Sequence, residues 1–186
     1  MSIVLRKAAA PDVPGIEALI ARSARGLSGD DYRPTQVEGA LRGAFGVDTQ
    51  LLADGTYFIA EDGAAWAGCG GWSYRATLFG GDAREGRDAS RLDPRTQAAK
   101  IRAFFVDPAY ARRGVATLLL EHCEAEALRH GFTHTELMGT LPGVKFYAAR
   151  GYLGGPMIRY DVGGGEGIEF IPMRKDLRGP APDAGR

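Results

Sequence analysis

The stretch FFVDPAYARRGVATLLLEHCEAEALRHGF, residues 104–132, decides how this chain folds. A bulky apolar run comes first, Asp107-Pro108 turns the chain, and a Leu-rich helix follows. The first turn of that helix carries no acidic side chain, although its free N–H groups and its dipole make a helix start partly positive. Gly114 and Ala116 add little bulk, which leaves room for an anion beside the backbone. We therefore expect a ligand phosphate to bind where this helix begins.

Two adjacent arginines, Arg112 and Arg113, precede the helix and offer planar donors suited to phosphate oxygens. Taken alone, RRGVA is a weak motif, because paired arginines are common on wet surfaces. The chain contains neither GxxxxGK[ST] nor GxGxxG. The context nevertheless strengthens the motif, because the preceding strand, the Pro turn, the basic pair, the small residues and the Leu-rich helix are all consistent with a phosphate site. Such consistency favours a phosphate site over an ordinary strand-to-helix junction.

The composition limits the class of protein. Lys plus Arg and Asp plus Glu both number 23 in 186 residues, so no global charge attracts nucleic acid or an acidic membrane. The length predicts one domain over residues 1–175, followed by a disordered tail over 176–186. Cys69 and Cys123 lie far from any metal-ligand spacing, so we expect reduced packing residues, no metal and a cytoplasmic protein. No segment predicts a signal peptide or a bilayer span.

The first half of the chain predicts a strand over 3–7 and a helix entered through Asp12. A second helix is expected over 34–45, with Pro34 at its start. Two β-rich runs follow around Asp62-Gly63, a dipeptide typical of tight hairpins. Period-two alternation along the second run predicts one shared face, an acceptor wall or plain core, for Trp66, Trp72 and Tyr74.

The second half begins with a charged stretch without periodicity, residues 80–97, which is either an active-site flap or a solvated connection. Strand, helix and strand over 99–139 then imply a right-handed crossover and a parallel strand pair. A short helix stopped by Gly151 follows, and a hairpin around GGGEG closes the sheet. The fold class is therefore α/β with a mixed sheet.

At this point the chain resembles the GNAT superfamily of acyl-CoA-dependent N-acyltransferases over nearly its whole length. ARRGVA at 111–116 resembles the family's acyl-CoA loop, Q/R-x-x-G-x-G/A, with Ala111 standing where Gln or Arg is usual and Arg112 or Arg113 available in its place. FYAARGY at 146–152 resembles the family's late helix. The resemblance implies a mostly antiparallel sheet, flanked by helices, in which one parallel pair linked by the crossover helix splays apart. It also implies acetyl-CoA as the acyl donor.

The same resemblance assigns the site residues. Main-chain groups of Phe104 and Val106 are the expected partners of the pantetheine arm, with Phe105 on the opposite face, and the Val106 N–H is expected to polarise the thioester carbonyl. Tyr147 is the expected general acid for the departing thiolate. The residues expected at the diphosphate are Arg112, Arg113, Gly114, Val115, Ala116 and Thr117.

The general base stays open at this point. The strand over 99–106 carries Lys100 and Arg102 on one face, where many family members have a carboxylate. That face either looks into the cleft, where it would bind an acceptor carrying a carboxylate or phosphate, or reaches solvent and pairs with the acidic loop over 80–97. The proton is taken by a water chain or by a carboxylate such as Glu61 or Glu136. Histidines are weaker candidates for the base. Surface positions on the crossover helix better explain His122 and His130, and His134, which begins a strand, is only slightly better as a base.

The expected function is transfer of an acetyl group from acetyl-CoA to a primary amine of a small molecule or peptide. The sequence leaves monomer and homodimer open. A CoA-sensing or partner-binding domain of the same fold is the main alternative, because Ala111 and the missing strand carboxylate depart from the family pattern. A generic nucleotide-phosphate binder is weaker, because the P-loop lysine is absent.

Overall fold

A computed structural model describes residues 2–179 of the chain. Its strands form one sheet in the order β1-β2-β3-β4-β5-β8-β6, and β7 pairs with another part of β8. The strands are β1 (Ile3–Lys7), β2 (Tyr57–Asp62), β3 (Ala65–Ser73), β4 (Ala99–Val106), β5 (His134–Thr140), β6 (Leu153–Gly154), β7 (Ile158–Gly163) and β8 (Glu166–Asp176). The helices are α1 (Val13–Leu27), α2 (Pro34–Ala40), α3 (Thr49–Ala53), α4 (Val115–Arg129) and α5 (Leu141–Ala148), with short 3-10 turns η1 (Ala10–Asp12) and η2 (Pro108–Tyr110).

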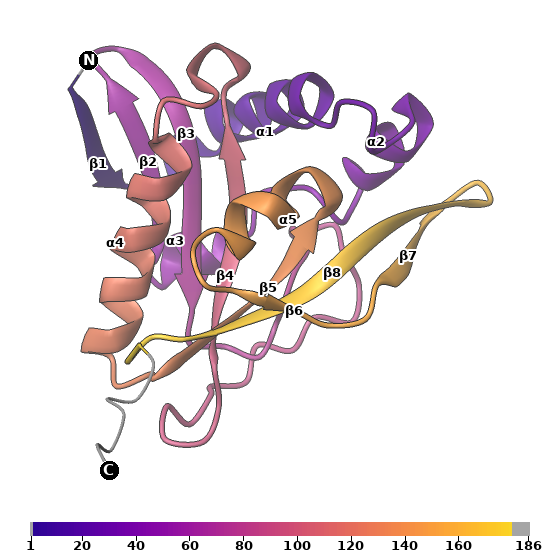
Figure 1. The fold of residues 1–186 in the computed structure, drawn as a ribbon. Helices are drawn as coiled ribbons and strands as arrows, with labels where there is room; N and C mark the ends of the chain where they lie inside the picture. Colours follow the sequence, from indigo (N-terminus) through magenta and orange to yellow (C-terminus); the bar gives the residue numbers. More distant parts are fainter. Residues whose placement is uncertain (1, 180–186) are drawn as a thin grey trace.

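Helices cover both faces of the sheet, and each face has its own apolar core (Figure 1). On one face the apolar stripe of α1, which includes Leu19 and Ile20, packs with buried residues of β2 and β3. On the other face Leu119, Leu120 and Cys123 of α4 pack with Trp72 and Ile101. This two-layer burial explains why the middle strands are buried at nearly every position.

The expected splay between β4 and β5 is present. The two parallel strands pair only through Ala99 with Thr135 and Lys100 with Glu136. Beyond that point β5 continues along β8, while β4 continues along β3. The mostly antiparallel sheet, the single parallel pair and the crossover through α4 confirm the fold class drawn from the sequence.

A bulge in β4 lies at the splay. The register between β3 and β4 shifts between Cys69 and Gly71, and Ala103 has φ of 53°. A positive φ is costly for a residue with a Cβ, so the surroundings must hold it. The hydroxyl of the buried Tyr57 does so by donating to the Ala103 carbonyl over 2.8 Å.

Two predictions about elements are wrong, and two elements were not predicted. The second helix ends at Ala40 instead of continuing to residue 45, and the chain then turns into α3, which the pattern did not predict. The two-residue strand β6 was also not predicted. The prediction that Trp66 and Trp72 share one face is wrong. Because the register between β2 and β3 shifts beside Ala60, Trp66 packs on the α1 face of the sheet and Trp72 on the α4 face.

The loop over 80–97 lies against the end of β3 and the start of α3. Backbone hydrogen bonds join Ala76 to Ser90 and Leu92 to Tyr74, and Asp82 accepts from the Thr49 N–H. At the C-terminus β8 runs to residue 176, and the rest of the predicted tail from 180 onward lies outside the described residues. In residues 2–179, no helix combines the length and the apolar character that a membrane crossing requires.

Candidate active site

The N-terminus of α4 is open. Gly114 is its N-cap residue with φ of 83°, Arg112 two residues earlier has φ of 63°, and no side chain caps the helix. A Cβ placed on Gly114 meets no atom within 4 Å. Alternating left-handed residues turn successive N–H groups toward one side, and such concave backbones bind anions. The geometry therefore fits the anion site expected at this turn.

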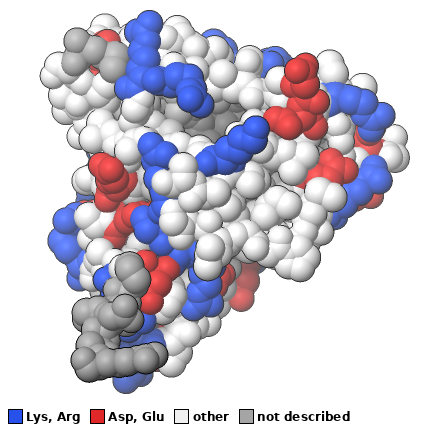
Figure 2. All heavy atoms as spheres, viewed as in Figure 1, with Lys and Arg blue, Asp and Glu red and all other residues white. Residues whose placement is uncertain are grey.

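A cavity of about 870 Å³ runs from this helix end through the splay to α1. Figure 2 shows its mouth as a hollow above α5, with Lys and Arg side chains along the edge. Arg113 is the one expected site residue outside the cavity lining, and its guanidinium lies 5.5 Å from the Tyr110 ring centre. The expected residues that the cavity brings together are Phe104, Phe105, Val106, Arg112, Gly114, Val115, Ala116, Thr117 and Tyr147.

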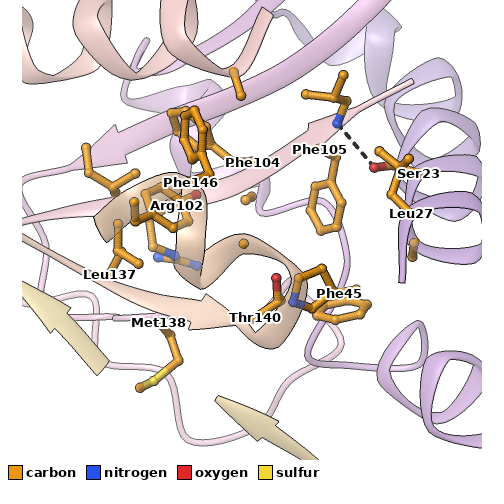
Figure 3. Close-up of a pocket in the computed structure, with 18 of the residues that line it drawn as sticks. Ser23, Leu27, Phe45, Arg102, Phe104, Phe105, Leu137, Met138, Thr140 and Phe146 are labelled. Atoms are coloured by element: carbon orange, nitrogen blue, oxygen red, sulfur yellow. Dashed lines mark hydrogen bonds between the residues drawn. The ribbon is translucent and has the colours of Figure 1, made fainter. Parts of the chain in front are cut away.

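The end of β4 presents its backbone to this cavity. Phe104 packs with the α4 core and Phe105 with the α1 core, so their side chains leave the strand on opposite faces, as alternation predicts. The Val106 N–H donates to the Ser23 hydroxyl over 3.1 Å (Figure 3). A ligand carbonyl at this N–H would therefore have to share the donor with Ser23 or displace it.

Tyr147 lies on α5 and lines the cavity between Phe146 and Tyr152, whose ring centres are 5.0 and 5.6 Å from its own. Burial raises the pKa of the Tyr147 phenol well above its ordinary value. The phenol is therefore protonated at neutral pH, which is the state that a proton donor needs.

Ser23 and Arg150 are among the cavity residues that the sequence reasoning missed. Ser23 lies on the apolar stripe of α1, one turn after Leu19, where a lone serine is an unusual core residue. Arg150 places its guanidinium 4.2 Å from the ring centre of Phe146 and donates to the Thr117 hydroxyl in the first turn of α4. A cation at the end of α5 is a common C-terminal pattern, so its sequence position alone did not mark it.

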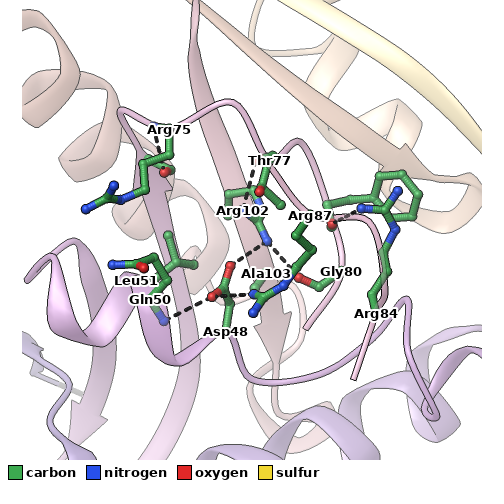
Figure 4. Close-up of polar contacts among 12 residues, drawn as sticks. Asp48, Gln50, Leu51, Arg75, Thr77, Gly80, Arg84, Arg87, Arg102 and Ala103 are labelled. Atoms are coloured by element: carbon green, nitrogen blue, oxygen red, sulfur yellow. Dashed lines mark hydrogen bonds and ion pairs between the residues drawn. The ribbon is translucent and has the colours of Figure 1, made fainter. Parts of the chain in front are cut away.

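Lys100 and Arg102 are both buried and both paired, and only Arg102 lines the cavity. Lys100 donates to Glu136 over 2.9 Å. Arg102 donates to the Asp48 carboxylate over 2.8 Å and to the carbonyls of Thr77 and Gly80 (Figure 4). The alternative in which both side chains reach solvent and pair with the acidic loop is therefore wrong, because both are buried and their carboxylate partners, Glu136 and Asp48, lie outside the loop over 80–97.

The other groups considered as bases lie outside the cavity lining. Glu61 accepts from Arg6 on the first two strands, and Glu136 is held by Lys100. The rings of His122 and His130 pack on Phe58 and Trp72, and His134 lies 3.5 Å from Asp176. Within residues 2–179, no three His, Cys, Asp or Glu side chains are grouped closely enough to hold a metal ion.

Comparison with known proteins agrees with this architecture. The family model described as the acetyltransferase (GNAT) family matches residues 29–152. A search of curated proteins finds no match.

Among solved structures, a GCN5-related N-acetyltransferase from Rhodopseudomonas palustris is 20% identical with a TM-score of 0.70, over 95% of this chain and 96% of that one. The PaiA N-acetyltransferase from Thermoplasma acidophilum, in complex with coenzyme A, is 15% identical with a TM-score of 0.63, over 95% and 99%. The ribosomal-protein-S18-alanine N-acetyltransferase from Escherichia coli is 15% identical with a TM-score of 0.61, over 100% and 99%. At these identities the three structures show a shared fold.

Proposed function

Because the chain belongs to the GNAT family of acetyltransferases, we propose that it transfers an acetyl group from acetyl-CoA to a primary amine of a small molecule or peptide. One observation carries the proposal. The open N-terminus of α4, the unpaired edge of β4 and the Tyr147 phenol all border one continuous cavity. A diphosphate, an amide-rich arm and a thioester can therefore be held in a row.

The diphosphate is assigned to the first turn of α4. The N–H groups of Val115, Ala116 and Thr117 have no intrahelical acceptor, and negative charge is favoured at a helix N-terminus. Arg112 borders the same end of the cavity, and we add Arg150 as a second cation there. Arg113 contributes charge near the mouth, outside the lining.

The pantetheine arm is assigned to the splay. Past Lys100 the edge of β4 that faces β5 has no strand partner, and buried backbone groups without partners are costly. An arm with two amides can pair with the backbone of Phe104 and Val106 in the manner of an added strand. Its thioester then reaches the region where Val106, Ser23 and Tyr147 border the cavity.

The chemistry needs one proton donor and one carbonyl donor. Tyr147 gives its proton to the CoA thiolate as the C–S bond breaks. The Val106 N–H donates a hydrogen bond to the Ser23 hydroxyl in this structure. When the thioester carbonyl replaces that hydroxyl as the acceptor, the N–H polarises the carbonyl.

The test of this function uses the full chain. We expect isothermal titration to show binding of acetyl-CoA, and we expect thiol release from acetyl-CoA when a panel of amines, amino acids and peptides is added. Folded protein that binds no acetyl-CoA would exclude the proposal.

One observation favours a second candidate, a CoA-sensing domain. Each carboxylate or histidine considered as a base from the sequence lies outside the cavity lining. A sensor would bind acetyl-CoA but release no thiol with any member of the panel, whereas a transferase releases thiol with at least one.

A further inference from the structure

The part of the cavity beyond the splay is an aromatic chamber. Its wall is a row of neighbouring rings: Phe105 and Phe45 in edge contact at 5.8 Å, Phe45 and Phe170 in edge contact at 6.3 Å, and Phe170 and Phe79 tilted against each other at 5.4 Å between ring centres. Figure 3 shows Phe45 and Phe105 beside Leu27 and Ser23 of α1. We call this row the phenyl wall. Flat apolar groups bind such walls through offset and edge-to-face contacts.

The charged side chains that line the cavity are all cationic: Arg102, Arg112, Lys145 and Arg150. Arg112 comes from the loop before α4, Lys145 from α5 and Arg150 from the turn after α5, so they belong to the end assigned to the diphosphate. Arg102 borders the cavity from β4, and its charge is paired with Asp48 on the side toward α3. Acidic side chains are visible on the outer rim in Figure 2, but the lining itself offers an ammonium group no carboxylate partner.

An ammonium ion is therefore poorly matched to this chamber. Moving a charged group out of water is costly unless an opposite charge compensates it. An alkyl amine with a pKa of about 10 is neutral in only about one molecule in a thousand at pH 7, so little of it can enter in the reactive form. An aromatic amine is already neutral at this pH, because its lone pair is delocalised into the ring.

We propose that the acceptor is an uncharged aromatic amine whose ring lies against the phenyl wall and whose nitrogen points toward the splay. This inference rests on the proposed acetyl transfer. The amine nitrogen forms a bond to the acetyl carbon as the C–S bond breaks, and the thiolate takes the proton of Tyr147. The proton lost from the acylated nitrogen returns to the Tyr147 phenolate through solvent, so no separate carboxylate base is required.

The test compares two isomers, 4-methylaniline and benzylamine, which have the same atoms but differ in the basicity of the amine. Thiol release from acetyl-CoA is measured with the full chain between pH 6.5 and 9. At pH 7 we expect kcat/KM for 4-methylaniline to exceed that for benzylamine by about tenfold or more. We also expect a flat pH profile for 4-methylaniline and, for benzylamine, a rise of about tenfold per pH unit as its neutral fraction grows.

Preference for benzylamine at pH 7, or a benzylamine rate independent of pH, would overturn the inference and leave the acetyl transfer standing. Release with peptide or alkyl amines but with neither isomer would have the same meaning. If acetyl-CoA does not bind and no amine of the wider panel releases thiol, the proposed function itself fails.

A pair of variants tests the electrostatic step separately. Leu27 is half-buried, lines the chamber at the end of α1 and is close in size to both Asp and Asn. Leu27→Asp places a carboxylate beside the phenyl wall, and Leu27→Asn is its neutral control. We expect the benzylamine to 4-methylaniline ratio of kcat/KM to be at least about fivefold higher in Leu27→Asp than in Leu27→Asn. Equal ratios in two folded variants would contradict the charge argument.

Discussion

Arg112 and Gly114 are the two residues whose backbone conformations underlie the proposed anion site. Both have left-handed backbones, which glycine adopts without cost and arginine adopts at a cost of about 1–2 kcal/mol. Neither conformation is needed to begin a helix, because a helix start normally uses a residue in the β region. The strain is therefore best explained by the concave backbone that it creates before α4.

Gly114→Glu tests this site directly. The new side chain would project into open space at the N-terminus of α4 and add a negative charge where the diphosphate is expected. We expect acetyl-CoA affinity in isothermal titration to fall by about a hundredfold or more, through charge repulsion and lost backbone access.

Gly164→Glu is the matched control. Gly164 also has a positive φ, 64°, and open space around it, but it lies in the turn between β7 and β8. Its replacement carries the same backbone strain without touching the cavity, so acetyl-CoA affinity should stay close to that of the unaltered protein. Equal losses in the two variants would mean that strain, and not the anion site, explains the effect.

Tyr147→Phe tests the proton donor. The replacement keeps the ring that packs against Phe146 and Tyr152 and removes only the hydroxyl. We expect kcat to fall by about a hundredfold, within the usual range for general acid catalysis, while the acetyl-CoA dissociation constant changes by less than about threefold. Tyr160→Phe, on β7 outside the cavity lining, should leave both values unchanged. An unchanged kcat in Tyr147→Phe would assign the acid to another group.

At the scale of elements, β4 is held at its middle by a buried ion pair. Arg102 has only 2% of its side chain exposed and Asp48 only 3%, and the pair joins β4 to the start of α3 and to the loop carrying Thr77 and Gly80. Asp48 has a second cationic partner, Arg87, at 2.7 Å. Arg102→Met removes the more buried of the two partners, so we expect the free energy of unfolding to fall by about 3 kcal/mol.

Urea unfolding measures this loss, and the exposed pair of Arg95 with Asp93 supplies the control. The Arg95 side chain is 86% exposed, so Arg95→Met should cost less than about 1 kcal/mol. If Arg102→Met and Arg95→Met lowered the free energy of unfolding by similar amounts, the buried pair would contribute no more to stability than the exposed pair.

Adding Asp48→Leu to Arg102→Met removes the buried carboxylate and leaves Arg87 paired with Asp82. The double variant should therefore recover part of the loss, but not all of it, because the Asp48 side chain also caps α3 by accepting from the Gln50 N–H.

The elements that the sequence predicted well are those with local causes. The Asp62-Gly63 hairpin, the strand, helix and strand around α4, and the end of α5 before Gly151 follow from short turns and periodicity. The anion site that we expect at α4 also rests on a local pattern, the small residues and basic pair before the helix.

What the sequence missed depends on residues far apart in the chain. The shift in register beside Ala60 depends on the neighbouring strand, so the alternation of Trp66 and Trp72 gave no sign of it. Arg102 and Asp48 are 54 positions apart, and Ser23 reaches Val106 across 83 positions. Without the fold, nothing in the pattern joined these partners.

At the scale of the whole molecule, two buried thiols make the free energy of unfolding decrease as the pH rises into the alkaline range. Cys69 and Cys123 are fully buried, one in each core. Burial raises the pKa of Cys69 from 9.0 to about 12 and raises the pKa of Cys123 well above its ordinary value. From about pH 8 the unfolded chain therefore loses these protons while the folded protein keeps them, so stability is complete below about pH 8 and falls as the pH rises toward 12.

Each such thiol contributes up to about 1.4 kcal/mol of lost stability per pH unit in that range. Five tyrosines with raised pKa follow the same rule: Tyr32, Tyr57, Tyr74, Tyr147 and Tyr152. Their ordinary pKa is about 10, so between pH 8 and 9 the thiols dominate the slope, whereas above pH 9 the tyrosines add to it.

Between pH 8 and 9 we expect urea unfolding under reducing conditions to show a smaller slope in Cys69→Ala than in the unaltered protein, whatever the variant loses in absolute stability. Cys69→Ala combined with Cys123→Ala should keep only the minor slope that the tyrosines cause. An undiminished slope in the double variant would mean that other groups govern the alkaline limit of this fold.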